Sequence, residues 1–128
     1  MSNVPNDRKY TKDHEWARQQ GKVVVVGVTF HAQEALGDVV YVELPKVGAA
    51  AVAGKPFGVI ESTKAVSELF APIAGKIVKI NDRLVKEPTL VNQDPYGAWM
   101  IEIEPADPKA FAALMEASDY EKLTAEKG

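Results

Sequence analysis

The sequence predicts a mainly β fold, a sandwich or barrel of short strands, from two observations. Short runs rich in valine, isoleucine and aromatic residues recur at regular spacing, and glycine, proline, asparagine and aspartate stand between them. The chain has 128 residues, which is long enough to bury a core without disulfides or metals. We therefore expect one domain over residues 1–128, with residues 1–9 as a flexible N-terminal tail.

The predicted strands, in chain order, are residues 23–30, 39–44, 57–61, 65–70, 76–80 and 99–104. Each is bounded by residues that favour turns because of their backbone preferences. These are Pro45 and Gly48, Gly54 and Pro56, Pro72 and Gly75, Asn81 and Asp82, Pro88, and then the run from Asp94 to Gly97. The repeated alternation of strand and turn makes a mostly β architecture the expectation.

Residues 31–36 depart from the strand pattern and predict a single helical turn, which Gly37 would end. Residues 107–116 predict an amphipathic helix, because Asp107 can cap it and Pro108 suits its first position. Its apolar residues recur at helical spacing and would cover the sandwich: Ala110, Phe111, Leu114 and Met115.

Residues 120–127 are a further helical candidate, although this charged, thinly apolar tail is as prone to fray as to fold.

A faint internal repeat aligns the segment that begins at Gly37 with the segment that begins at Gly75, which suggests two similar halves facing each other. The two halves would then be joined by a hairpin around residues 61–68, with Lys64 near its tip. A lysine on a tight turn is sterically open, and its four-carbon stem gives reach to an amide-linked group. Taken alone, however, a surface lysine is usually only a solvated charge.

Composition makes several function classes improbable. The net charge of -3 and the pI near 5.4 disfavour nucleic acid as a partner, because phosphate binding needs a basic surface. The chain has no cysteine, so disulfides, thiolate metal sites and cysteine nucleophiles are excluded. The longest apolar run, residues 23–30, is too short to cross a membrane, and the N-terminal residues do not look like a signal or transit segment. We expect a cytoplasmic protein with no membrane partner.

An enzyme is also disfavoured by the motifs. His14 and His31 belong to no Ser-His-Asp set and to no metal cluster, and no glycine-rich phosphate loop is present. Glu61 and Glu68 form an acidic pair, but a hairpin tip exposes such residues and does not bury them in a pocket that would tune their acidity.

Five motifs in order, and two further matches after them, resemble the H-protein family of the glycine cleavage system across residues 10–122. They read YTKDHEW from Tyr10, GVTFHAQ from Gly27, LGDVVYVELP from Leu36, ESTKAVS from Glu61 and PIAG from Pro72, followed by NQDPYG from Asn92 and Trp99. The resemblance implies a flattened barrel-sandwich hybrid of two similar halves, with the lipoyl lysine on a β-hairpin. It also implies a short helix near residues 31–36 and a C-terminal helix packed outside.

The resemblance further implies a carrier and not an enzyme. Lys64 would hold lipoate in amide linkage and take an aminomethyl group from glycine decarboxylase to aminomethyltransferase, after which lipoamide dehydrogenase would reoxidise the arm. A lipoate ligase or octanoyltransferase would load Lys64. The partners' own cofactors are not expected to bind here.

Site residues follow from the same resemblance. Glu15 and Glu68 occupy positions that hold the amine of the loaded arm in a surface cleft, and Asp13 is their neighbour. Glu61, Glu68 and Gly75 occupy positions that the lipoylating enzyme needs. Ala35 stands where some relatives have a cleft histidine, so that contact is not expected.

The sequence also leaves simpler roles open for these residues. Glu15 could face solvent, Gly75 could supply only a turn conformation, and Glu61 and Glu68 could keep the hairpin soluble. Trp16 and Trp99 could be core residues.

Other functions are also possible for a hairpin lysine. A lipoyl or biotinyl domain of a 2-oxo acid dehydrogenase or a biotin carboxylase usually has Asp-Lys-Ala or Met-Lys-Met, and neither tripeptide occurs here. An H-like protein that relays lipoyl groups to other enzymes would have the same motifs. A purely structural interaction module would never gain mass on a lysine.

Overall fold

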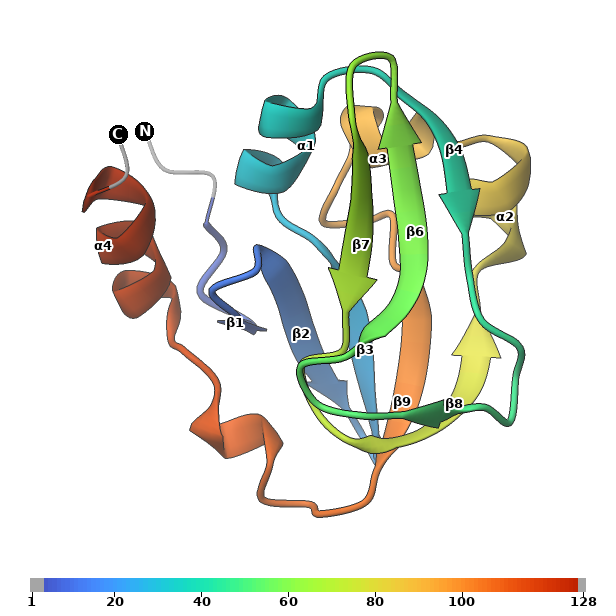
Figure 1. Ribbon diagram of the computed structural model, residues 1–128. Coiled ribbons are helices and arrows are strands. Elements are labelled where there is room, and N and C mark those ends of the chain that lie inside the picture. Colours follow the sequence, from blue (N-terminus) through green and yellow to red (C-terminus); the bar gives the residue numbers. More distant parts are fainter. Residues whose placement is uncertain (1–3, 127–128) are drawn as a thin grey trace.

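The computed structural model describes residues 4–126, and within them the strands form two antiparallel sheets (Figure 1). The larger sheet has the order β1-β2-β3-β9-β8-β5 and the smaller has the order β4-β6-β7. The strands are β1 (Lys9–Tyr10), β2 (Glu15–Gln20), β3 (Val23–Val28), β4 (Val39–Glu43), β5 (Ala50–Ala51), β6 (Pro56–Ser62), β7 (Val66–Phe70), β8 (Gly75–Ile80) and β9 (Ile101–Pro105). The mainly β prediction is confirmed.

All six predicted strands exist, and residues 4–126 contain three further strands that were not predicted. β2 forms a hairpin with β3, in which Glu15 lies opposite Val28 and Gln20 lies opposite Val23. β1 and β5 have two residues each, too few to leave a pattern in the sequence. The repeated segments of the sequence analysis become β4 and β8, which lie in different sheets.

The core lies between the two sheets, where β-branched and other aliphatic side chains face inward. Ile60 and Leu69 reach it from the smaller sheet, and Val26, Ile77 and Ile103 reach it from the larger sheet; all five are buried. Each such side chain stabilises the fold by about 1.5–3 kcal/mol relative to an exposed position. This burial fixes the register of β6 and β7, because a slip of one residue would expose Ile60 and Leu69.

Helix α1 (Phe30–Leu36) confirms the predicted helical turn at residues 31–36. The Thr29 hydroxyl accepts a hydrogen bond from the Ala32 amide, which caps the start of the helix. Gly37, with φ of 81°, ends it as predicted. Two short helices that were not predicted, α2 (Asp82–Lys86) and α3 (Leu90–Gln93), connect β8 to β9.

The helix predicted for residues 107–116 is wrong. The segment forms turns and one short 3-10 helix, η1 (Phe111–Ala113), and Met115 then pairs with Tyr10 in an antiparallel bridge. Both backbone hydrogen bonds of that bridge are made, at 2.9 and 3.0 Å, so pairing with β1 outweighs the helical pattern. Phe111 and Leu114 still pack against the core, as their apolar spacing suggested.

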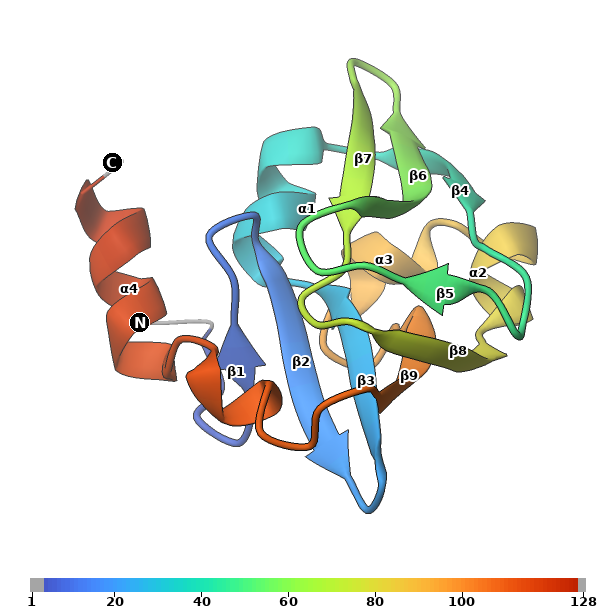
Figure 2. The same ribbon diagram turned by 60° about the horizontal axis from the view of Figure 1, so that its bottom comes forward.

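The C-terminal helix is α4 (Ala117–Glu126), which begins before the predicted residues 120–127; residue 127 lies outside the described residues. It lies against β1 at the edge of the larger sheet (Figure 2). No helix among residues 4–126 is long and apolar enough to cross a membrane.

The flexibility predicted for residues 1–9 stays a prediction. In that range Lys9 belongs to β1, and the Arg8 guanidinium lies 4.6 Å from the centroid of the Trp16 ring.

Candidate functional site

Lys64 lies at the tip of the β6–β7 hairpin, which projects beside α1 (Figure 1). The turn is tight because Ser62 closes it: the Ser62 amide donates to the Ala65 carbonyl at 2.8 Å. The Ser62 hydroxyl accepts hydrogen bonds from the amides of Lys64 and Ala65 at 3.3 and 3.1 Å. Thr63, Lys64 and Ala65 are exposed, so the lysine side chain is accessible on a turn of defined shape.

A groove of about 280 Å³ runs beside this hairpin, between β7, α1 and the loop that precedes β2. Ala32, Ala35 and Leu36 of α1 form part of its apolar wall. Its acidic lining residues are Asp13, Glu15 and Glu68, so the structure brings together the three acids that the resemblance placed in a cleft.

Glu15 is the most unusual of these acids because only 2% of it is exposed. One carboxyl oxygen accepts a hydrogen bond from the Thr11 hydroxyl at 2.9 Å, and the other accepts one from the Phe70 amide at 3.2 Å. The side chain therefore links β2 of the larger sheet to β7 of the smaller sheet. Burial raises the pKa of Glu15 to about 8, with the Asp13 charge adding to the rise and the two hydrogen bonds opposing it. The open alternative that Glu15 faces solvent is wrong.

His14 also lines the groove, and it joins a polar network that the sequence analysis missed. Its Nδ1 lies 2.7 Å from the Tyr120 hydroxyl, which lies 2.7 Å from the Thr29 hydroxyl. The His14 ring stacks on His31 with 4.4 Å between centroids. Burial raises the pKa of Tyr120 to about 12, so its hydroxyl stays protonated at neutral pH. Tyr120 comes from α4, 106 residues away along the chain, so no local sequence signal could have indicated this contact.

Glu61 and Gly75 lie outside the groove. Glu61 pairs with Val66 across the hairpin, so it is close to Lys64. Gly75 is the first residue of β8, which follows the end of β7 that lies away from the turn. A Cβ on Gly75 would clash with the Glu104 carbonyl oxygen, so close pairing of β8 with β9 requires glycine there. A role of Gly75 in supplying only a turn conformation does not fit this position.

The outer face of the smaller sheet is an acidic and apolar surface next to Lys64. The register aligns Tyr41, Glu61 and Val66 in one row and Glu43, Val59 and Glu68 in the next. A bulge in β4 also exposes Val40 beside Tyr41, and Val66 is 69% exposed. We call these seven residues the outer face. The three strands contain no lysine or arginine, so this face is complementary to a basic partner surface.

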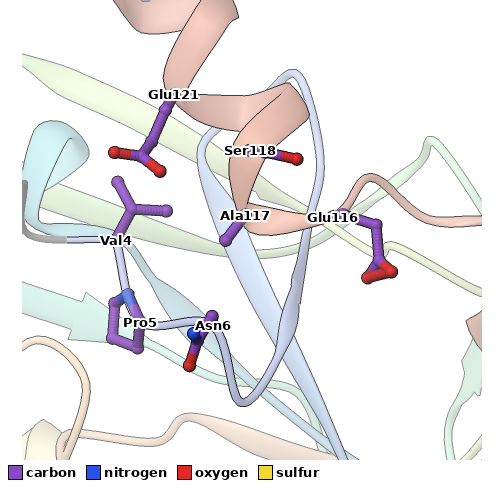
Figure 3. A pocket seen from close by; sticks show the side chains of 7 residues that line it. All are labelled: Val4, Pro5, Asn6, Glu116, Ala117, Ser118 and Glu121. Carbon is purple, nitrogen blue, oxygen red and sulfur yellow. The ribbon is translucent and has the colours of Figure 1, made fainter.

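A larger hollow, of about 570 Å³, lies between the N-terminal segment and the start of α4 (Figure 3). It is lined by Val4, Pro5 and Asn6 on one side and by residues including Glu116, Ser118 and Glu121 on the other. It contains neither Lys64 nor any of the predicted site residues, and we assign it no function. Among residues 4–126 no three histidine or acidic side chains gather as metal ligands would.

Comparisons with known proteins identify what the chain resembles over its length. A family model described as "Glycine cleavage H-protein" matches residues 8–127. The glycine cleavage system H protein of Myxococcus xanthus (strain DK1622) is 66% identical over 122 residues, which cover 94% of this chain and 95% of that protein. The H protein of Anaeromyxobacter sp. (strain K) is 56% identical over 125 residues, covering 97% of this chain and 98% of that protein. A crystal structure of the H protein from Mycobacterium marinum superimposes with a TM-score of 0.88 at 43% identity, covering 95% of this chain and 99% of that chain.

Proposed function

Because the chain belongs to the glycine cleavage H-protein family, we propose that it is the lipoyl carrier of the glycine cleavage system and that Lys64 holds the lipoate in amide linkage. The observation that carries the proposal is the position of Lys64, exposed at the tip of a tight hairpin and beside a groove with three acids. The family matches favour this function over a lipoyl or biotinyl domain of another complex. The protein itself would catalyse no step.

The residues around Lys64 fit a lipoyl arm. When attached, lipoate supplies a disulfide that can open, carry the aminomethyl group and be closed again by oxidation. The apolar wall of α1 suits the hydrocarbon part of such an arm, and the acids at the groove suit the cationic amine of its cargo. Because Glu15 is almost fully buried, an amine bound there would be shielded from water, which protects the cargo from hydrolysis.

Glu15 would also respond to its ligand. With a pKa of about 8, the Glu15 carboxyl holds a proton at neutral pH in the free protein. A cationic amine at hydrogen-bond distance favours the carboxylate, so docking of the loaded arm would lower the pKa of Glu15 and release its proton. Asp13 and Glu68 are exposed, and they would add a weaker, screened attraction at the mouth of the groove.

The partners would be the enzymes of the system: glycine decarboxylase, aminomethyltransferase and lipoamide dehydrogenase. A lipoate ligase or octanoyltransferase would load Lys64, with Glu61, Glu68 and Gly75 as its recognition residues. The outer face is the surface we expect a basic partner to contact, because it lies next to Lys64. Tethering makes each transfer effectively intramolecular once a partner docks, at effective concentrations on the order of mM. A cytoplasmic location stays a prediction.

Reconstitution tests this function. The lipoylated chain is mixed with glycine, tetrahydrofolate, NAD and the three partner enzymes of a bacterium whose own H protein is left out. We expect NADH to form only when glycine is present. Lys64→Arg should abolish it, whereas Lys86→Arg, which changes an exposed lysine on α2, should leave it unchanged. If the lipoylated chain gives no NADH in a mixture that the bacterium's own H protein completes, the chain does not serve glycine cleavage there.

A further inference from the structure

We propose that Asn92 is a positioning residue for Lys64, which acts by holding the backbone of residues 37–39 on which the lysine stem and the hairpin turn rest. Asn92 begins one of the motifs shared with the family, yet it lies on α3, outside the groove and the hairpin. The inference rests on the proposed role of Lys64 as the attachment residue.

The side chain of Asn92 makes three hydrogen bonds, all to the segment that ends α1 and begins β4. Its Oδ1 accepts from the Val39 amide at 2.8 Å. Its Nδ2 donates to the Gly37 carbonyl at 2.8 Å and to the Gln33 side-chain oxygen at 3.0 Å. Because a backbone amide only donates and a carbonyl only accepts, this geometry requires a group with an acceptor and two donors, which asparagine has and aspartate lacks.

Residues 37–39 meet the hairpin turn at two places. The Thr63 amide donates to the Asp38 carbonyl at 3.0 Å. Asp38 lies between Gly37 and Val39, whose backbone groups are hydrogen-bonded to Asn92. The Lys64 stem passes over Gly37: its Cε lies 3.3 Å, and its Nζ 3.9 Å, from the position that a Cβ on residue 37 would occupy. The stem therefore rests where the chain has no side chain.

Gly37 is suited to this role by its backbone as well as by its lack of a side chain. Its φ of 81° and ψ of -151° lie in a region that is essentially open only to glycine. Such a conformation persists only where the surrounding structure stabilises it, and the hydrogen bond from Asn92 to the Gly37 carbonyl is one stabilising contact.

The direction of the stem follows from these contacts. Leu36, the residue before Gly37, lines the groove, and so does Ala65, the residue after Lys64. A stem that rests on Gly37 therefore starts any arm on Nζ beside the same groove that Glu15 lines. Without the support from Asn92, the turn would keep its internal bonds to Ser62 but lose its fixed orientation relative to α1.

The test compares Asn92→Asp with a matched control, Asn81→Asp. Asn92→Asp keeps the acceptor for Val39 but loses both donors. Asn81 makes a similar bridge away from Lys64: its Nδ2 donates to the Trp99 carbonyl at 2.8 Å and its Oδ1 accepts from the Arg83 amide. Three quantities are measured on folded protein: the NMR contact between the Lys64 ε-protons and the Gly37 α-protons, the exchange rate of the Thr63 amide, and kcat/KM for lipoylation by lipoate ligase.

We expect Asn92→Asp to lose the NMR contact, to speed Thr63 exchange roughly tenfold and to lower kcat/KM about five- to tenfold, because each of the two lost hydrogen bonds makes only a modest net contribution. Asn81→Asp should match the wild type in all three.

If Asn92→Asp does not fold, Gln33→Met, which removes only one of the three Asn92 bonds, should shift the same quantities in the same direction by less. The proposal is overturned if the contact and Thr63 exchange stay at wild-type values, or if both variants change alike. If the wild type is not lipoylated at Lys64, the proposed function fails, yet the first two quantities, measured on the unlipoylated chain, still test the positioning.

Discussion

Glu15 and Lys64 have opposite environments, and each suits a different part of the proposed function. Lys64 is exposed on a turn, where a modifying enzyme can reach it. Glu15 is buried, and both its carboxyl oxygens accept hydrogen bonds. A buried carboxyl of this kind is costly when ionised, so it holds its proton to higher pH than an exposed one. That cost is measurable as a dependence of stability on pH.

The free energy of unfolding should report the raised pKa of Glu15. The carboxyl titrates at about 8 in the folded chain and near 4.3 in an unfolded one. Between these values the unfolded chain has lost the proton and the folded chain retains it, so this group's contribution to stability falls as pH rises and levels off above pH 8. Glu15→Gln removes the titration, so its stability relative to wild type should increase from pH 5 to pH 8 by on the order of a few kcal/mol.

Denaturant unfolding of both proteins at several pH values in this range measures the difference. Glu68→Gln is the matched control, because Glu68 lines the same groove but is exposed, and its difference from wild type should stay nearly constant. A constant difference for Glu15→Gln as well would show that Glu15 is already ionised in the folded chain near pH 5.

For single residues, the sequence could indicate which ones belong to the candidate site, but not what surrounds them in the fold. Lys64 and the three groove acids came from motifs, and the groove contains all three acids. The buried Glu15 carboxyl accepts a hydrogen bond from the Phe70 amide, 55 residues away along the chain, so no local pattern could have indicated this environment. Asn92 was visible only as part of a motif, because its partners on α1 and β4 become neighbours through tertiary packing.

Among the elements, α4 shows most clearly how tertiary contacts decide structure. Its sequence is charged and thinly apolar, so its own helical tendency is weak. Tyr120 anchors it: the side chain is fully buried and stacks on Tyr10 with 4.8 Å between ring centroids. Its hydroxyl lies within hydrogen-bond distance of His14 and Thr29, which connects the helix to the loop beside the groove.

Tyr120→Phe keeps the ring stacking but removes the hydroxyl. We expect a loss of about 1–3 kcal/mol in the free energy of unfolding, because the buried Thr29 hydroxyl loses a partner. Amide exchange in α4 should rise more than exchange in β6 and β7, since the hydroxyl ties the helix to the body. The control is Tyr41→Phe, an exposed tyrosine on β4, which should change stability by less than about 0.5 kcal/mol. Equal effects of the two changes would mean that the Tyr120 hydroxyl does not hold α4.

The strands and helices also show why some elements could be predicted and others could not. The valine-rich β3 and the β6–β7 hairpin have clear patterns between turn residues, and they formed as expected. β2 has the sequence EWARQQ, in which two adjacent apolar residues are followed by three polar ones, so it lacks a strand alternation, and pairing with β3 makes it a strand. Residues 107–116 have a helical pattern, but the bridge from Met115 to Tyr10 overrides it.

For the whole molecule, the arrangement of two sheets separates a rigid body from an accessible tip. The core between the sheets fixes the base of the β6–β7 hairpin through Ile60 and Leu69. The tip projects beside α1 (Figure 1), with Lys64 exposed. The groove and the outer face both adjoin the hairpin, and they share Val66 and Glu68. A carrier needs this combination, because each partner must reach the arm while the body retains its shape.

The most direct measurement of the central claim is the mass of the chain after co-expression with a lipoate ligase in the presence of lipoate. We expect the intact protein to gain the mass of one lipoyl group, peptide mapping to place it on Lys64, and Lys64→Ala to gain nothing. Peptides that contain other exposed lysines, such as Lys55 and Lys86, should stay unmodified. A chain that gains no mass while a known H protein in the same cells does, or a lipoyl group on any other lysine, would contradict the account.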